Sequence, residues 1–295
     1  MRLWNGSSLQ PWRNACSPED SSQSHGRLRR RNGTPTVIGC LLFLLLLPPT
    51  LRGDETFRFV QLTDLHIDGG TDHVQRVTRA VDAINALPMP IEFVLVTGDL
   101  VNNNITNSNT VRRLTSLLRR LHPTVHVLPG NHDTVPKRWP ETTNAYVQAL
   151  GPMLTTFTCH GVVFLLLADE TLHDTRLAAE HSDYKPMEWL EAQLRATTNQ
   201  PVIVVHHRPC VEDFHDNTLH AGWPQPTRDR WTELVNRYRV SAEIAGHFHR
   251  DELYWVGNVP LYVAAPIAGY YGRQASFRLY EWRDGHLSYR TVYLR

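Results

Sequence analysis

Apolar residues along the chain occur as short, nearly unbroken runs that alternate with segments of helical spacing. The runs predict buried strands at 57–62, 91–97, 125–128, 162–168, 202–205 and 242–245. Between the runs, apolar positions that recur every three or four residues predict helices at 74–87, 111–121, 185–195 and 227–239. From position 261 onward, short alternating segments predict further strands. Buried strands that alternate with helices favour an α/β fold in which helices cover both faces of the sheet.

The first 51 residues have a different pattern. Residues 1–35 are rich in Ser, Asn, Arg, Gly and Pro and lack apolar periodicity, which predicts a disordered basic leader. Residues 36–51 contain a Leu-rich run that follows an Arg cluster and ends at two prolines, as in a secretory signal peptide. The run is shorter than the roughly 20 residues of a membrane-spanning helix, and an uncleaved signal anchor is the alternative. We therefore expect the folded domain to occupy 54–295.

The signal-like segment at 36–51 predicts where the protein is located in the cell. A signal peptide directs the chain into the secretory pathway, where it would be lumenal or extracellular, or anchored to the membrane through 36–51 if the signal is not cleaved. The sequon Asn104-Ile105-Thr106 agrees with a glycoprotein. In an oxidising compartment Cys159 and Cys210 could form a disulfide, and two separate buried thiols are the alternative.

Composition excludes one class of partner. The 295-residue chain has a net charge of +1, and several of its arginines cluster before position 36. Because binding to a nucleic-acid backbone needs many clustered Lys and Arg side chains, the domain is not expected to bind nucleic acid. The chain also contains 16 His, a high number for its length. Metal ligation is one reason for such an excess.

Polar clusters follow five of the predicted strands directly. They are Asp64-Leu65-His66, Gly98-Asp99, Gly130-Asn131-His132-Asp133, His206-His207 and Gly246-His247-Phe248-His249. Any one of them could be an ordinary turn or loop tip, since Asp, Asn and Gly favour turns. In α/β sheets, however, ligands bind in the crevice beyond the carboxyl ends of the strands. Five clusters at five strand ends therefore predict one shared site.

The residue types in these clusters suit a metal centre. Carboxylates, imidazoles and an Asn amide oxygen are donors for Fe, Mn or Zn, not for metals that need sulfur ligands. A shared Asp can bridge two cations roughly 3.5–4 Å apart, which is the spacing in hydrolytic two-metal sites. Such a pair acidifies a bound water and holds phosphoryl oxygens. The pattern is therefore typical of a hydrolytic two-metal site.

Taken together, the motifs D-x-H, G-D, G-N-H-D, H and G-H-x-H resemble the calcineurin-like metallophosphoesterase superfamily. The resemblance extends from about position 57 to the C-terminus. It implies a four-layer αββα sandwich, in which two packed mixed β-sheets are flanked by helices and the metal site lies at strand C-terminal ends. It also implies hydrolysis of phosphodiesters or phosphomonoesters by in-line attack of a hydroxide shared between two metals. The segments VQLTDLHID, MEWLEAQL and SFRLYEWRDGHL are similar to the cyclic-nucleotide phosphodiesterase-like branch.

The resemblance also assigns roles to residues. It implies two metal sites joined by a bridge, with Asp64, His66 and His249 at the first, Asn131, His206 and His247 at the second, and Asp99 between them. His206 is preferred because it is the first residue after the strand, with His207 as the alternative. His132 would stabilise charge or protonate the leaving group, and Asp133 would orient His132 by accepting its second ring N–H.

Several alternatives remain open at this level. A phosphoprotein phosphatase of the same fold is one, although Asn102 replaces an Asp that many members of the superfamily carry. A non-catalytic, metal-binding secreted protein is another, but it would lack at least one ligand, and none is missing. The loop at 209–226 is either a wall of the substrate site or an ordinary surface loop. Arg208 is either a phosphate contact or a surface cation.

Overall fold

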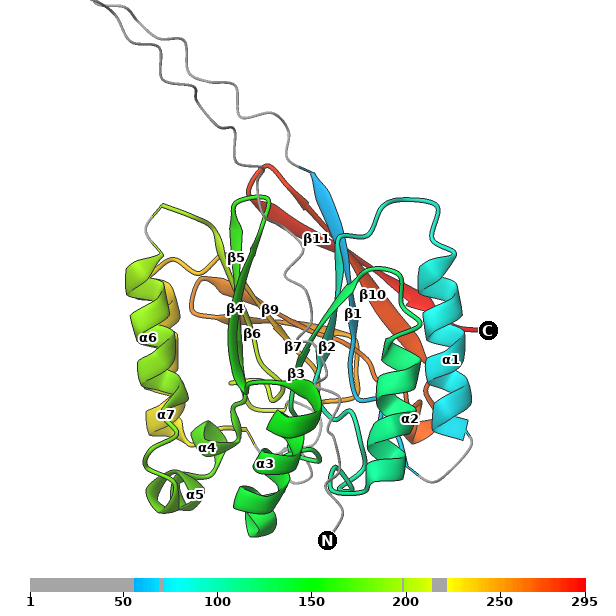
Figure 1. The fold of residues 1–295 in the computed structure, drawn as a ribbon. Coiled ribbons are helices and arrows are strands. Elements are labelled where there is room, and N and C mark those ends of the chain that lie inside the picture. The colour runs from blue at the N-terminus through cyan, green and yellow to red at the C-terminus, as the bar shows by residue number, and fades with distance from the viewer. Residues whose placement is uncertain (1–55, 69–71, 198, 214–221) are drawn as a thin grey trace, which may run out of the picture.

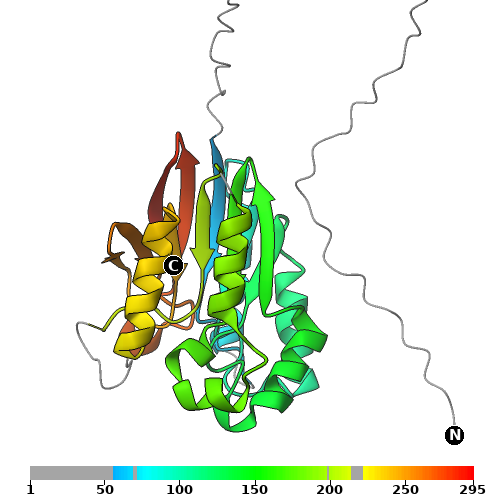
Figure 2. The same cartoon turned by 90° about the vertical axis from the view of Figure 1, so that its left-hand side faces the viewer.

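The computed structural model describes residues 56–68, 72–197, 199–213 and 222–295. Its elements form four layers, with helices outside two β-sheets that face each other (Figures 1 and 2). The predicted αββα sandwich is thereby confirmed. The predicted leader and signal segment, at 1–35 and 36–51, lie outside the described residues. Within the described part of the chain, no helix is both long enough and apolar enough to span a membrane.

The first sheet has five strands in the order β11-β10-β1-β2-β3. Their bounds are β1 Phe57–Leu62, β2 Phe93–Thr97, β3 Thr124–Leu128, β10 Ser276–Arg283 and β11 His286–Tyr293. Strands β1, β2 and β3 are parallel, with Phe59 opposite Phe93 and Phe93 opposite Thr124. Strand β10 runs antiparallel to both β1 and β11. The carboxyl ends of the three parallel strands therefore lie along one edge of this sheet.

The second sheet has six strands in the order β4-β5-β6-β7-β9-β8. Their bounds are β4 Leu154–Cys159, β5 Val162–Leu167, β6 Val202–Val205, β7 Ala242–Ala245, β8 Glu252–Val256 and β9 Val259–Val263. The four central strands are parallel, and the edge strands β4 and β8 are antiparallel to their neighbours. Both sheets are therefore mixed, with three parallel strands in the first and four in the second.

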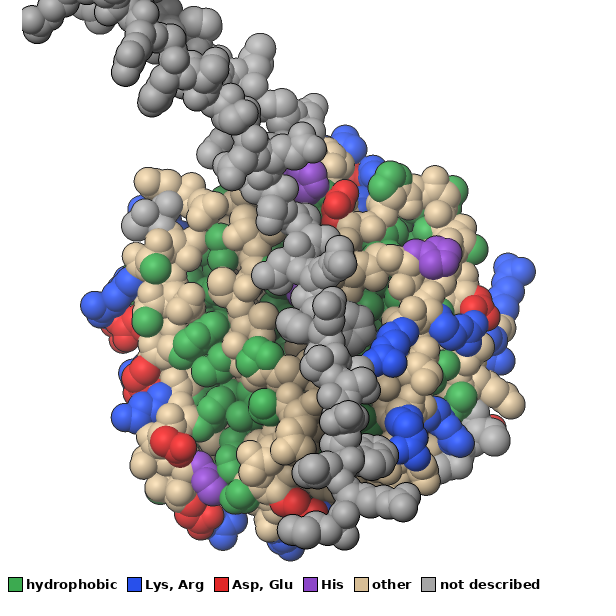
Figure 3. All heavy atoms as spheres, in the orientation of Figure 1, with side chains coloured by type: hydrophobic (Ala, Val, Ile, Leu, Met, Phe, Trp, Pro, Cys, Tyr) green, Lys and Arg blue, Asp and Glu red, His purple; other side chains and the backbone are tan. Residues whose placement is uncertain are grey.

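Helices cover the outer face of each sheet (Figure 1). Helices α1 (Asp72–Asn85) and α2 (Ser108–Leu118) lie outside the first sheet, and α6 (Pro186–Ala196) and α7 (Gln225–Arg237) outside the second. Helices α3 (Trp139–Leu150), α4 (Glu170–His173) and α5 (Thr175–Glu180) and two 3₁₀ turns, Pro136–Arg138 and Tyr270–Gly272, complete the described elements. Lys and Arg side chains gather over α1 and α2 (Figure 3), opposite the faces that these helices bury.

An apolar layer between the two sheets packs them against each other. It contains aromatic rings from both, and Phe59 of β1 stacks on Phe93 of β2 with ring centroids 4.8 Å apart. Phe164 of the second sheet meets the ring of Phe59 edge-on at 5.5 Å. Buried aromatic pairs contribute about 0.5–1.5 kcal/mol beyond the burial of their surface. This packing places the carboxyl ends of β1 and β2 beside those of β6 and β7.

The two cysteines of the domain lie apart. Cys159 is the last residue of β4, and Cys210 lies in the loop after β6. Both are buried, and among the described residues no disulfide joins them. The alternative of two separate buried thiols is therefore the one that the structure contains.

Candidate metal centre

The predicted polar clusters meet where the strands of both sheets end. The loop after β1 is tied to the loop after β2, since Asp64 N–H donates to Gly98 O at 3.0 Å and His66 N–H donates to Asp99 O at 2.9 Å. Across the second sheet, Gly246 N–H donates to His207 O at 2.9 Å. These backbone hydrogen bonds hold the loops together independently of any ligand.

The backbone at this point is unusual. Asp64, His66, Asp99, His247 and His249 all have positive φ, between 44° and 67°. Left-handed backbone costs a non-Gly residue on the order of 1 kcal/mol, and such strain is concentrated at functional sites. A strained backbone of this kind persists only where the surrounding packing holds it in place.

The residue between each pair of candidate ligands is an apolar anchor. Leu65, between Asp64 and His66, is fully buried among the residues that pack under α1 and α2. Phe248, between His247 and His249, is fully buried under the other helical layer. Each anchor directs its own side chain into a core, while its two neighbours contribute to the same group of polar side chains. The D-x-H and H-x-H spacings therefore have a packing explanation.

A first group of donors is formed by Asp64, His66, Asp99 and His249, all buried. The Nε2 atoms of His66 and His249 face each other at 3.4 Å, and His249 Nε2 lies 3.1 Å from Asp64 Oδ1. Asp99 Oδ2 lies 3.6 Å from His66 Nε2. Separations of this size are those between ligands of one cation whose bonds are about 2.0–2.2 Å long.

A second group shares Asp99 with the first. It consists of Asp99, His207 and His247, and His207 Nε2 lies 3.3 Å from Asp99 Oδ2. Asn131 adjoins this group, because its neighbour His132 donates a backbone N–H to Asp99 Oδ1 at 2.8 Å. The Oδ1 atom of Asn131 is buried and accepts no hydrogen bond from the described residues. A buried amide oxygen in that state is costly unless a ligand uses it.

The expected orientation of His206 is corrected by the structure. Its Nε2 lies 3.0 Å from Glu243 Oε2 and its Nδ1 lies 2.9 Å from Arg208 O, away from the other donors. Side chains alternate between the faces of a strand. Val202 and Val204 face the helices, whereas Ile203 and Val205 face the other sheet. His206 continues the first set and His207 the second, so His207 is the residue that reaches Asp99.

The expected partnership between His132 and Asp133 is also absent. Asp133 is fully buried, and its carboxylate accepts backbone N–H groups of Leu100 at 3.1 Å, Val101 at 2.9 Å and Gly130 at 2.9 Å. Burial and the charge of Asp99 raise the pKa of Asp133 to about 7 despite these bonds. Asp133 therefore joins the loop after β3 to the loop after β2, and does not orient the ring of His132.

His132 itself is at the open side of the site. Its side chain is about one-third exposed, and its Nε2 lies 4.0 Å from Asp99 Oδ2. Its ring meets that of His66 edge-on at 4.9 Å. An exposed imidazole beside a buried group of ligands can exchange protons with a bound molecule, in keeping with the position expected of it.

The electrostatics of the site call for added positive charge. In the described residues, the ion-pair partners of Asp64 and Asp99 are histidines. Burial lowers the pKa of His207, but the carboxylates of Asp99, Asp64 and Asp169 together outweigh burial and raise it to about 10. Burial lowers the pKa of His66 to about 4, although the carboxylates of Asp99 and Asp64 oppose the shift. Buried carboxylates need a compensating charge, and two cations would supply it while leaving the histidines neutral. The residues therefore fit a pair of metal ions.

Two glycines allow this close approach. A Cβ on Gly130 would overlap Asp99 and lie 2.8 Å from Cδ2 of His207. A Cβ on Gly98, whose φ is 89°, would lie 2.6 Å from Cγ of His207. The glycines of the G-D and G-N-H-D motifs thus leave room for the side chains that converge on Asp99.

Sequence reasoning missed Tyr270, which lies in the 3₁₀ turn Tyr270–Gly272. Its ring stacks on that of His249, with centroids 5.2 Å apart and planes 10° apart, and meets the ring of His66 edge-on at 4.9 Å. The only signal in the sequence was an aromatic Gly-Tyr-Tyr-Gly segment after the last parallel strand. Tyr270 forms a side of the candidate site.

Two further hypotheses, that Arg208 contacts phosphate and that the loop at 209–226 forms a wall of the substrate site, have less support. Arg208 is buried and pairs with Glu170 at 3.1 Å, so it does not extend into the group of ligands. In the loop at 209–226, Trp223 is buried against Trp231, with ring centroids 5.0 Å apart. Residues 214–221 of this loop lie outside the described residues.

Comparisons with known proteins agree with the geometry. Residues 57–251 match the family model of the calcineurin-like phosphoesterases. The serine/threonine-protein phosphatase CPPED1 of Mus musculus is 25% identical over 225 residues, which cover 70% of each chain. A probable cyclic nucleotide phosphodiesterase of Moraxella catarrhalis is 24% identical over 225 residues, covering 68% of this chain and 74% of that protein.

Solved structures show the same fold. A dimetal phosphatase from Danio rerio has a TM-score of 0.56 at 13% identity, over 81% of this chain and 99% of that chain. GAP50, the anchor in the inner membrane complex of Plasmodium, has a TM-score of 0.59 at 12% identity, over 81% and 84%. The family model covers well over half of the sequence and includes all the polar clusters described above. This chain therefore belongs to the calcineurin-like phosphoesterase family, the hydrolases of phosphate ester bonds.

Proposed function

We propose that this protein hydrolyses phosphate esters with two metal ions held at the strand ends. The observation that carries the proposal is the sharing of Asp99 by two groups of buried donors. Asp64, His66 and His249 would complete one metal site, and Asn131, His207 and His247 the other. Oxygen and imidazole donors without a thiolate favour Fe, Mn or Zn.

The bound metals would supply charge for the phosphoryl oxygens and acidify a water molecule. The chain supplies the remaining functions. Asp99 holds the two sites at a fixed separation, and the backbone N–H of His132 fixes one carboxylate oxygen of Asp99. The ring of His132, on the open side, donates a proton to the leaving oxygen. General acid help of this kind contributes about 10²–10⁴-fold in rate.

Metal content and hydrolysis test this proposal together. The purified chain is expected to contain about two metal ions, the number in hydrolytic sites of this kind, and to cleave bis(p-nitrophenyl) phosphate or p-nitrophenyl phosphate. Chelation should abolish cleavage, and adding Mn²⁺ or Zn²⁺ back should restore it. Elemental analysis and the release of nitrophenol are the measurements. Cleavage that continues at an undiminished rate in a metal-free preparation would refute the proposal.

The aromatic residue that lines the candidate site bears on the class of substrate. We favour a small phosphodiester or phosphomonoester with an aromatic or nucleoside group, because the ring of Tyr270 lies against two candidate ligands. A probable cyclic nucleotide phosphodiesterase among the relatives supports the same choice. A phosphoprotein substrate is the second candidate, and the CPPED1 relative favours it.

Replacing Tyr270 with Ala tests the aromatic contact. KM for bis(p-nitrophenyl) phosphate is expected to rise about fivefold, since loss of one ring contact costs on the order of 1 kcal/mol. Tyr270→Phe should behave like the wild type, and metal content should stay the same in both variants. Tyr293→Ala, at an exposed position of β11, is the matched control. An unchanged KM in Tyr270→Ala would remove this residue from the substrate site.

We also propose that the protein enters the secretory pathway, on the strength of the Leu-rich segment at 36–51. Glycosylation at Asn104 receives less support, because its Nδ2 donates to Thr110 Oγ1 at 3.2 Å and would have to be released. A tagged full-length chain is expected to resist added protease in intact microsomes and to become sensitive when detergent is added. Digestion without detergent would place the domain on the cytosolic side and refute the proposal.

A further inference from the structure

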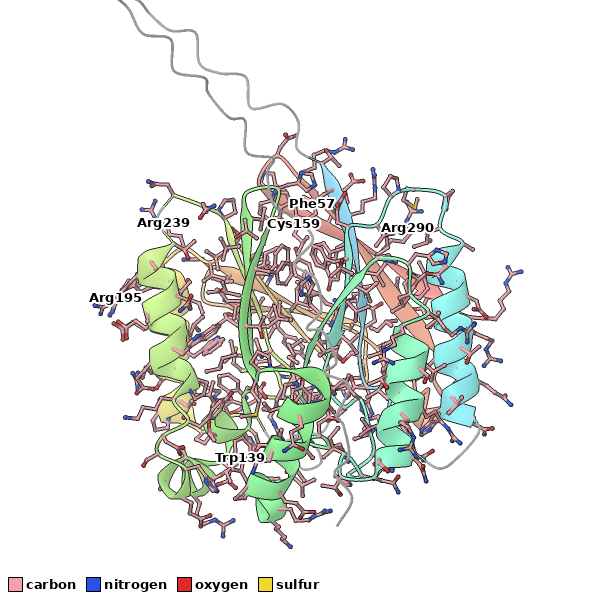
Figure 4. All side chains as sticks on the ribbon, in the orientation of Figure 1. Phe57, Trp139, Cys159, Arg195, Arg239 and Arg290 are labelled. Atoms are coloured by element: carbon pink, nitrogen blue, oxygen red, sulfur yellow. The ribbon has the colours of Figure 1, made fainter. Side chains whose placement is uncertain are left out.

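A second group of metal-binding residue types lies at the other end of the sheets. Strand β4 ends at Cys159, and the two-residue turn His160-Gly161 leads into β5. Both turn residues have positive φ, 45° and 76°, as a tight hairpin requires. Figure 4 shows Cys159 beside Phe57, at the end of the molecule where β1 begins. Asp64 and Asp99, by contrast, follow the carboxyl ends of β1 and β2.

The third member comes from the first sheet. Glu92 precedes β2, and its N–H donates to Arg58 O of β1 at 2.8 Å. Asp99 lies seven positions after Glu92, which is about 20 Å along extended chain. This group therefore cannot share a ligand with the centre at the opposite end.

One donor atom from each of Glu92, Cys159 and His160 lies within 4.8 Å of the other two. The Nε2 of His160 lies 3.7 Å from Glu92 Oε1. The ring of His160 rests on Phe57, with centroids 5.3 Å apart and planes 16° apart, so its position is restricted. Cys159 is buried, while the Glu92 and His160 side chains are about two-fifths exposed. Two of the three donors are therefore accessible to an ion from solvent.

We propose that Glu92, Cys159 and His160 bind one zinc ion, with water as the fourth ligand. A thiolate, an imidazole and a carboxylate are the usual zinc ligands, and the thiolate separates this site chemically from the oxygen and nitrogen donors around Asp99. On binding, the Cys159 thiol releases its proton to solvent as the S–Zn bond forms. Because Glu92 adjoins β2 of the first sheet and Cys159 and His160 lie at the β4–β5 hairpin of the second, the zinc clamps the two sheets together.

A comparison within the chain supports the choice of cysteine. His206, Cys210 and Glu243 form another compact group, but it is fully buried, and both ring nitrogens of His206 and the thiol of Cys210 already make hydrogen bonds. Glu243 Oε2 accepts Trp231 Nε1–H at 3.1 Å and pairs with His206 at 3.0 Å. Burial raises the pKa of the Cys210 thiol well above its usual range, which opposes formation of a thiolate. Cys210 is therefore the matched control for Cys159.

Cobalt spectroscopy provides the test, because a cysteine thiolate bound to Co²⁺ gives a near-ultraviolet charge-transfer band that oxygen and imidazole ligands do not. The full chain, stripped of metal and titrated with Co²⁺, is expected to show this band. Cys210→Ser should retain the band and Cys159→Ser should lose it. Absence of the band from the wild type, its persistence in Cys159→Ser, or its loss in Cys210→Ser would overturn the proposal.

Two substitutions at solvent-accessible positions test the same site even if Cys159→Ser misfolds. Glu92→Gln and His160→Asn should each lower the affinity for zinc by at least about tenfold, while hydrolysis of bis(p-nitrophenyl) phosphate is unchanged. Zinc content should be one equivalent higher in the wild type than in Cys159→Ser. Unchanged zinc affinity in both exposed variants would refute the clamp. The band and the hydrolytic activity are independent readouts, so failure of one proposal does not imply failure of the other.

Discussion

Asp99→Ala is expected to lower kcat/KM by at least about 10³-fold, a loss of about 4 kcal/mol of transition-state stabilisation. The reason is that one carboxylate serves both groups of donors, with its Oδ2 at 3.6 Å from His66 Nε2 and 3.3 Å from His207 Nε2. Its removal should therefore reduce occupancy at both metal sites. Steady-state hydrolysis of bis(p-nitrophenyl) phosphate and metal analysis are the measurements.

Asp82→Ala is the matched control for this carboxylate. Asp82 lies on the exposed side of α1 and pairs with Arg120 at 2.6 Å, so its loss should leave activity and metal content unchanged. Asp99→Asn, which keeps the shape of the side chain, separates loss of charge from loss of packing and should also be inactive. Activity of Asp99→Ala within tenfold of the wild type would remove Asp99 from the bridging position.

The second large effect is a contrast between two adjacent histidines. His207→Ala should lose one of the two metals and at least about 10³-fold in kcat/KM, because its Nε2 faces Asp99. His206→Ala should instead destabilise the fold, because it leaves the buried carboxylate of Glu243 without its histidine. Breaking a buried pair by removing one partner costs about 3–5 kcal/mol.

Chemical denaturation and metal analysis on both variants separate these outcomes. The folded fraction of His206→Ala should keep both metals, and His207→Ala should keep a free energy of unfolding closer to that of the wild type in metal-free buffer. Loss of metal in His206→Ala with no loss of stability would reverse the assignment. Such a result would mean that His206 turns toward Asp99 in solution.

Most of the fold could be predicted from local pattern. Strand β1 spans the predicted residues, and α1 was predicted at 74–87 and lies at Asp72–Asn85. The missed elements are those whose apolar pattern is weak. Helix α3 contains several polar residues, and β4 is an edge strand with partly exposed residues that pairs only with β5. The conformation of β4 is set by its hairpin with β5, which an apolar pattern does not reveal.

The candidate site, like the fold, was predicted from the sequence only in part. The five motifs after the strands were identified from residue type and spacing alone, and the structure gathers the clusters of both sheets at one end. The expected role of Asp133 was wrong because three backbone N–H groups from two loops surround its carboxylate. Tyr270 was missed because its contact with His249 joins a turn near the C-terminus to the loop after β7.

By itself, the sequence determined the family, the strand ends that carry the chemistry and the kinds of ligand atom present, because each depends on residues close together in the chain. Only the tertiary structure decided between His206 and His207, since the choice depends on which face of β6 lies against the other sheet. The tertiary structure also brings Glu92 close to Cys159 and His160. Packing between sheets, unlike spacing within a motif, joins residues that no local pattern relates.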